Sequence, residues 1–181
     1  QFVLCLGSTE PRKNIRTAIE AFQKLGRVEP SLQLVITGVD YRRISPEKAF
    51  AGCNLNGVHF TGYVADADMP ALYSLADVFL FPSLYEGFGL PPLEAMACST
   101  PVVVSNATCL PEVIGDAAML VDPEDAAGIA GAVEMVISSG EVRSGLVEKG
   151  RARAAAFDWR RTAEETRKIY EQVIACHRTA T

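Results

Sequence analysis

The chain has 181 residues, of which 49% are hydrophobic and 22% are charged, a balance typical of one folded domain rather than of a disordered chain. Seventeen Lys and Arg residues against 22 Asp and Glu residues give a net charge of -5, so the basic excess typical of nucleic-acid-binding proteins is absent. No run of about 18 apolar residues occurs, so the sequence predicts no transmembrane helix.

Short apolar runs, typical of buried strands, alternate along the chain with segments of helical periodicity. From the N-terminus, the predicted elements are a strand at 2–6, a helix at 15–25, a strand at 32–37, a helix at 46–51, a strand at 58–61, a helix at 68–75 capped by Asp66 or Asp68, a strand at 78–81, a helix at 90–97, strands at 102–104 and 119–121, and helices at 126–137, 142–156 and 162–175. This order predicts an α/β fold, a Rossmann-like parallel sheet with helices on both faces and extra C-terminal helices. We expect Phe157, Trp159 and Tyr170 to hold those last helices against the core.

The five cysteines are odd in number and form no CxxC pair, and only two histidines accompany them, so no zinc cluster is predicted. Buried, inert thiols in a reducing cytoplasm are expected, with peripheral contact at the inner face of the membrane as a further possibility. The chain starts at Gln1 and enters an apolar run without a basic leader, which indicates a fragment of a longer protein rather than a signal peptide.

The segment EGFGLPPLE carries two carboxylates, Glu86 and Glu94, separated by two glycines and a helix start. Gly87 and Gly89 allow the backbone to approach a ligand closely. The amides of Gly89 and Leu90 lie at the positive end of the helix, where anions bind. The two carboxylates are placed to accept hydrogen bonds from the ribose and the hexose of a nucleotide sugar. The plainer alternative is that Glu94 balances the helix dipole and Glu86 is solvated.

Two cations, Arg12 and Lys13, stand immediately before the helix that begins near residue 14. The helix dipole disfavours positive charge at that end, so their position indicates a purpose such as pairing with a diphosphate. The alternative is a pair of solvated surface charges. A third candidate segment is the turn Gly62, Tyr63 and Val64, whose backbone groups are placed to face the edge of a nucleotide base.

These segments occur together and in order, with Pro101–Val103, Leu110–Val113 and Val121–Pro123 after them. The set resembles the C-terminal half of the glycosyltransferase family 4 (glycogen-synthase-like, GT-B fold) enzymes over essentially the whole chain. That family has two Rossmann-like domains facing across a cleft. The resemblance implies that residues 1–181 are a single donor-binding domain and that the N-terminal acceptor domain is absent from this chain.

The resemblance also assigns roles to the candidate residues. Lys13 matches the lysine that contacts the donor diphosphate, and Ser8, beside Gly7, stands where many members carry an arginine, so Arg12 is expected to supply the missing charge. The catalytic set implied is Glu86, Lys13 and Arg12, with Glu86 near the transferred sugar. The donor-binding set implied is Gly7 and Ser8 after the first strand, Gly62, Tyr63 and Val64 at the base, Gly87, Phe88, Gly89 and Leu90 at the phosphate and sugar, and Glu94 at the ribose.

The reaction implied is the retaining transfer of a hexose to a glycan or lipid-linked acceptor, without cofactor or metal. The loop Thr9–Asn14 resembles mannosyltransferases that use GDP-mannose, and UDP-glucose is the second candidate donor. The pair Asp66 and Asp68 has the spacing of a metal-binding motif, but helix capping explains it better. Two alternatives stay open: a nucleotide-sugar 2-epimerase of the same fold, and a non-catalytic nucleotide-binding module. The isolated chain is expected to bind nucleotide and to transfer sugar negligibly.

Overall fold

The computed structural model describes residues 1–26, 31–38 and 45–179. These residues form a six-stranded sheet in which every neighbouring pair is parallel, in the order β3-β2-β1-β4-β5-β6. The chain adds strands outward from β1 in one direction and then, from β4, in the other, so β1 and β4 lie at the topological switch point. The predicted Rossmann-like fold is confirmed. The strands are β1 (Phe2–Leu6), β2 (Gln33–Thr37), β3 (Val58–Gly62), β4 (Val78–Phe81), β5 (Val102–Ser105) and β6 (Met119–Val121).

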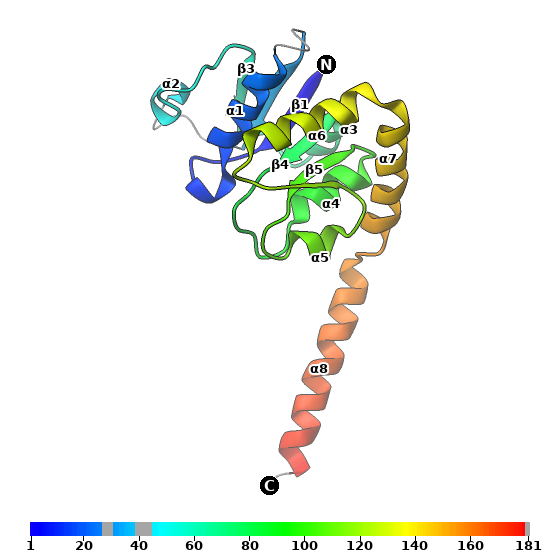
Figure 1. Ribbon diagram of the computed structural model, residues 1–181. Coiled ribbons are helices and arrows are strands. Elements are labelled where there is room, and N and C mark those ends of the chain that lie inside the picture. Colours follow the sequence, from blue (N-terminus) through cyan, green and yellow to red (C-terminus); the bar gives the residue numbers. More distant parts are fainter. Residues whose placement is uncertain (27–30, 39–44, 180–181) are drawn as a thin grey trace.

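The structure has a helix at every position where the sequence predicts a helix (Figure 1). A 3-10 turn at Pro11–Lys13 and the helix α5 (Leu110–Ile114) were not predicted, because each is too short to show helical periodicity and carries a proline in its first turn. The helices are α1 (Ile15–Leu25), α2 (Pro46–Ala49), α3 (Met69–Leu75), α4 (Leu90–Ala97), α5 (Leu110–Ile114), α6 (Ala126–Ser138), α7 (Gly140–Ala155) and α8 (Trp159–Thr179).

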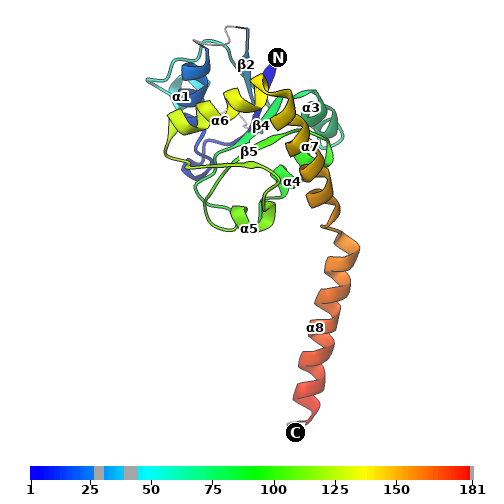
Figure 2. The same cartoon turned by 45° about the vertical axis from the view of Figure 1, so that its right-hand side comes forward.

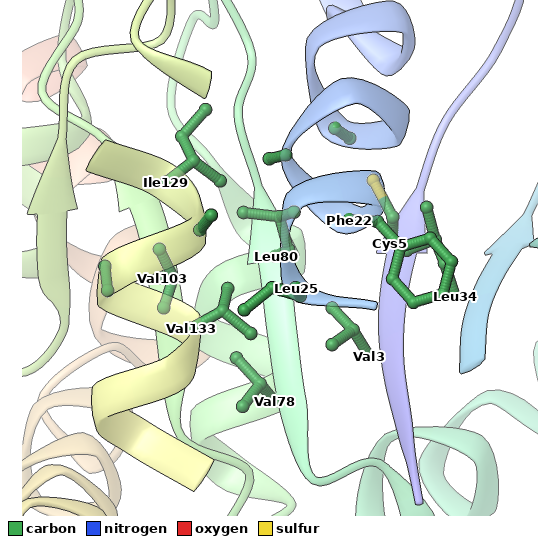
Figure 3. Packing of buried hydrophobic residues seen from close by; sticks show 14 of the residues in the cluster. Val3, Cys5, Phe22, Leu25, Leu34, Val78, Leu80, Val103, Ile129 and Val133 are labelled. Carbon is green, nitrogen blue, oxygen red and sulfur yellow. The ribbon is translucent and has the colours of Figure 1, made fainter. Parts of the chain in front are cut away.

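Alternate residues of each central strand point to opposite faces of the sheet, and both faces are covered. Val3, Cys5 and Leu80 pack under α1 and α6, as Figure 3 shows, together with Ile129 and Val133 of α6. The opposite face packs against α3, α4 and α5. The core on this side includes Leu4, Phe79 and Phe81 from the strands and Met96 and Leu110 from the helices. Burial on both faces explains why the strands are almost continuously apolar in sequence.

The cysteines differ in burial, and all five carry thiols rather than disulfides. Burial raises the pKa of the Cys5 thiol to about 12, so this group is inert at neutral pH. Cys53, Cys98 and Cys109 are half-buried and Cys176 is exposed. The expectation of buried thiols therefore holds for Cys5 and is wrong for Cys176.

The long C-terminal helix α8 projects away from the body of the molecule (Figures 1 and 2). Trp159 is 75% exposed and Tyr170 is 65% exposed, so the prediction that they hold the C-terminal helices against the core is wrong. Phe157, just before α8, does contact the body: its ring lies 5.7 Å from that of Phe88 in an edge-to-face arrangement. In the described part of the chain, no helix combines the length and apolarity needed to cross a membrane.

Candidate functional site

The loops that follow β1 and β4 meet at the carboxyl edge of the sheet. The backbone N–H of Leu84 donates to the carbonyl of Arg12 at 2.8 Å. The side-chain amide of Asn14 donates to the carbonyls of Pro82 at 3.0 Å and Pro123 at 2.7 Å, which ties the loops after β1, β4 and β6 together. Asn14 adopts a left-handed conformation with φ 55, which Asn tolerates better than most residues. Hydrogen bonds within the chain therefore hold these three loops together.

Three predicted site residues come together at this edge. The Lys13 ammonium lies 2.7 Å from Glu86 Oε1, and Arg12 Nη1 lies 3.3 Å from both carboxylate oxygens of Glu86. Arg12 Nε also binds Glu10 Oε2 at 2.6 Å. The Lys13 and Glu86 side chains are only 14% and 11% exposed, whereas Arg12 is 44% exposed. Two cations therefore face two carboxylates, and the cluster is close to neutral as it stands.

The floor beneath this cluster is aromatic. The Lys13 Nζ atom lies 5.0 Å from the centroid of the Phe81 ring, within the range of a cation–π contact. Phe81 is the last residue of β4 and is fully buried. The contacts with a carboxylate and an aromatic ring restrict the Lys13 side chain, so its charge stays at the carboxyl edge of the sheet between β1 and β4.

The two glycines of the loop before α4, Gly87 and Gly89, differ in backbone conformation and in surroundings. Gly89 is the N-cap residue of α4 with φ 97, and a Cβ there would lie 2.5 Å from Leu110 Cδ2. A Cβ on Gly87 would have nothing within 4 Å. Gly89 is therefore required by its own backbone conformation and by packing, whereas Gly87 faces open space, and the close approach of a ligand at either glycine stays a prediction.

This difference gives a prediction for stability. Gly89→Ala is expected to lower the free energy of unfolding by about 2–4 kcal/mol, since it combines an unfavourable left-handed conformation with overpacking against Leu110. Gly87→Ala is the matched control and is expected to stay within about 0.5 kcal/mol of the parent. Urea denaturation monitored by circular dichroism measures both. Equal losses in the two variants would contradict this interpretation of the loop.

The residues after β1 also have local reasons for their identity. A Cβ on Gly7 would collide with the side chain of Ile15, and the Gly7 N–H donates to the carbonyl of Thr37 at 2.9 Å. Ser8 Oγ accepts a hydrogen bond from the N–H of Glu10 at 3.2 Å. Gly7 thus permits α1 to pack closely on the sheet, and its contact with a donor, like that of Ser8, stays a prediction.

The predicted base-binding turn lies at the same edge, beyond β3. Gly62 adopts φ 73, and its carbonyl accepts from the N–H of Gly38 at 2.8 Å and from Thr37 Oγ1 at 3.2 Å. Tyr63 is 74% exposed and Val64 is half-buried. β3 lies two strands from β1 and three from β4, over whose last residue, Phe81, the Lys13 ammonium lies, so the turn and Lys13 share an edge of the sheet without being adjacent. The contact of this turn with a nucleotide base stays a prediction.

Asp66 and Asp68, just before α3, are the two candidates that the sequence offers as the cap of this helix. Asp68 occupies the N-cap position of α3, as predicted, but its carboxylate makes no capping hydrogen bond. The predicted capping bond is therefore wrong. By contrast, the Asp125 side chain does cap α6, accepting from the N–H of Ala127 at 3.0 Å.

Glu94 lies on the exposed side of α4, about 6 Å along the axis from its start. Its Oε2 accepts a hydrogen bond from the hydroxyl of Tyr73 at 3.0 Å. Burial of Tyr73, together with the nearby negative charge of Glu94, raises the pKa of the Tyr73 hydroxyl well above its usual value. Tyr73 therefore stays a donor and holds the Glu94 carboxylate against α3, and the contact of Glu94 with a ribose stays a prediction.

Thr108 and Cys109, in the loop after β5, were not among the predicted site residues. The backbone N–H of Glu86 donates to Thr108 Oγ1 at 3.3 Å, and the thiol of Cys109 donates to the carbonyl of Glu86 at 3.2 Å. Nearby, Ser83 Oγ is the one buried side-chain nitrogen or oxygen without a hydrogen-bond partner in the described residues. The position of this loop, after the strand next to β4 at the same edge, indicates that it borders the site, but the pattern of the sequence does not single out Thr108 and Cys109 within it.

The fold is a doubly wound, Rossmann-like domain, and domains of this class bind their ligands at the topological switch point, which here carries the ion pairs of Lys13, Arg12 and Glu86. A family model described as glycosyl transferases group 1 matches residues 1–153. The chain belongs to this family, and the predicted resemblance is confirmed.

The chain is similar to two bacterial mannosyltransferases. It is 38% identical over 175 residues to O-antigen chain mannosyltransferase B of Escherichia coli, covering 94% of this chain and 45% of that protein. It is 34% identical over 179 residues to MMP alpha-(1->4)-mannosyltransferase of Mycolicibacterium hassiacum, covering 96% of this chain and 43% of that protein. The chain thus spans less than half the length of these curated relatives.

Solved structures agree with the fold. Sucrose-phosphate synthase from Thermosynechococcus elongatus superimposes with a TM-score of 0.80 at 30% identity, covering 97% of this chain and 46% of that one. The C-terminal domain of the glycosyl transferase group 1 family protein LpcC from Francisella tularensis gives a TM-score of 0.73 at 27% identity, covering 86% of this chain and 84% of that one. The architecture is that of one half of a GT-B glycosyltransferase.

Proposed function

We propose that the chain is the donor-binding domain of a retaining glycosyltransferase, which moves a hexose from a nucleotide sugar to a glycan or lipid-linked acceptor. The observation that carries this proposal is the meeting of Lys13, Arg12 and the glycine loop before α4 at the β1–β4 switch point. Fixed cations and helix N-terminal amides at one place suit a diphosphate. Family membership supports the reaction class.

In this proposal, transfer breaks the bond between the anomeric carbon of the sugar and the oxygen of the distal phosphate. The electron pair of that bond goes to the leaving nucleoside diphosphate. Lys13 and Arg12, together with the amides at the start of α4, stabilise the added negative charge, which is the electrostatic route to catalysis. The two fixed cations support a reaction that needs no metal, and the proposal includes none.

The proposed donor is GDP-mannose. Two relatives whose names state mannosyl transfer are 38% and 34% identical to this chain. UDP-glucose is the second candidate, favoured by the 33% identity to glycogen synthase of Mycobacterium tuberculosis over 172 residues. The acceptor class follows from the same relatives and is part of the proposal.

We also propose that α8 packs against a second, acceptor-binding domain of the same protein. Its apolar side chains Ile169, Tyr170, Val173 and Ile174 recur at helical spacing and are all more than half exposed. The relatives are more than twice as long as the matched region, which leaves room for such a domain. The chain alone would then bind nucleotide and transfer sugar negligibly. The proposal places the whole protein in the cytoplasm, in contact with the membrane through the second domain.

A thermal-shift panel tests the binding step. A nucleotide at a free concentration of 100 times its Kd raises the free energy of unfolding by about 2.7 kcal/mol. For a chain of this length, that raises Tm by roughly 5–10 °C. We expect GDP and GDP-mannose to give the largest shifts, with UDP and UDP-glucose next. An unchanged Tm with every nucleotide would overturn donor binding. Formation of free epimerised nucleotide sugar by the whole protein would favour the 2-epimerase, and binding without turnover in the whole protein would favour a non-catalytic module.

A further inference from the structure

The segment Thr108–Leu110 holds the loop of Glu86 at three points. Thr108 Oγ1 accepts the N–H of Glu86 at 3.3 Å, and the Cys109 thiol donates to the carbonyl of the same residue at 3.2 Å. Leu110 Cδ2 packs where Gly89 lacks a side chain. Both polar groups of Glu86's backbone are therefore engaged by two consecutive side chains of another loop.

Thr108 is held in an unfavourable conformation to make this contact. Its φ is 52, and among the described residues the other non-glycine residues with positive φ are Asn14 and Ser99. A β-branched residue is a clear outlier in this region. Such backbone strain persists where the surroundings enforce it, and it gathers at functional sites. Both Asn14 and Thr108 lie in loops that touch the loop of Glu86.

The Glu86 side chain has a task that requires a fixed backbone. In the present arrangement its carboxylate binds Lys13 and Arg12, the same cations that the proposed diphosphate would need. The carboxylate must then leave those cations when the donor enters and turn to the sugar. The carboxylate reaches each partner in a reproducible geometry only if the backbone from which its side chain turns stays in place.

We propose that Thr108 and Cys109 are positioning residues that clamp the backbone of Glu86 while its carboxylate exchanges Lys13 and Arg12 for the bound donor. This proposal rests on the proposed function. It assigns a role to two side chains whose hydrogen bonds go to the backbone of Glu86 and not to its carboxylate.

The first test needs no nucleotide. Amide hydrogen exchange of Glu86 is measured by NMR in the parent chain, in Thr108→Val, which removes the acceptor at constant shape, and in Thr108→Ser, which keeps it. We expect exchange of the Glu86 amide to be roughly three- to tenfold faster in Thr108→Val and restored in Thr108→Ser. Unchanged exchange in Thr108→Val would overturn the clamp.

The second test separates positioning from stability. Thr108→Gly removes the hydroxyl and also relieves the positive φ, so its unfolding midpoint is expected to equal or exceed that of the parent. In the whole enzyme its kcat is nevertheless expected to fall roughly three- to tenfold with little change in KM. Cys109→Ala is expected to act in the same direction, with rescue by Cys109→Ser. Cys98→Ala and Ser138→Ala serve as controls away from the site.

A double-mutant cycle decides whether these residues act through Glu86. If they do, Thr108→Gly has no further effect on kcat in a Glu86→Gln background. Losses that multiply in the double variant would overturn the proposal. Failure of the parent to bind any nucleotide would instead overturn the proposed function, and the amide exchange experiment would still decide whether the clamp exists.

Discussion

Lys13→Ala is expected to weaken binding of GDP, or of UDP if that is the better ligand, by roughly 10- to 100-fold. The variant removes one hydrogen bond between charged groups, each worth about 1.5–3 kcal/mol, from a side chain that is only 14% exposed. It also leaves Glu86 with Arg12 as its remaining cation, so the carboxylate repels the entering phosphate more strongly. Isothermal titration calorimetry at fixed ionic strength measures the change.

Lys24→Ala provides the matched control for this experiment. Lys24 is an exposed lysine in the last turn of the same helix whose first turn follows Lys13, so it carries the same charge at the other end of α1. We expect its affinity to match that of the parent. If Lys13→Ala binds as tightly as Lys24→Ala, the diphosphate does not lie at the switch point.

Glu86→Gln is expected to move binding and transfer in opposite directions. The carboxylate is paired with both Lys13 and Arg12, so removal of its charge should tighten binding of the free nucleoside diphosphate roughly three- to tenfold. Transfer by the whole enzyme should fall by roughly 100-fold or more, since a charged group next to the reacting sugar is lost. Calorimetry gives the first value and a coupled assay of GDP release gives the second.

A graded comparison makes this prediction sharper. Glu10 pairs with Arg12 alone and its side chain is 58% exposed, so solvent screens its charge far more than that of Glu86. Glu10→Gln should therefore tighten binding only slightly and leave transfer near the parental rate. Weaker nucleotide binding in Glu86→Gln would show that the carboxylate helps to hold the ligand and does not compete with it.

The sheet could be predicted because its strands are buried on both faces and its helices show clear periodicity. Val78–Phe81 and the helix that follows Gly89 needed nothing beyond local pattern. The five-residue helix α5 could not be predicted, since one and a half turns give no periodic signal. The prediction for Trp159 and Tyr170 was wrong because the presence of a large aromatic residue in the sequence does not show whether its side chain packs against the core of its own domain.

The site was predicted in part. The sequence indicated that Lys13 and the loop of Glu86 belong together, because both follow strands at the carboxyl edge of a parallel sheet. It did not indicate that Glu86 already binds Lys13 and Arg12, since side-chain pairing depends on loop geometry. Nor could it separate a glycine required by its own φ, such as Gly89, from one that faces open space, such as Gly87.

The most direct test of the whole account is NMR mapping of the nucleotide site on this chain. Titration with GDP, and in parallel with UDP, is expected to shift the backbone amides of residues 12–14 and 87–90 most strongly, with smaller shifts at 62–64. Saturating shifts that cluster instead at the groove near the start of β2, lined by Phe22, Gln33, Asn54 and Gly57, with none at 12–14 or 87–90, would contradict it.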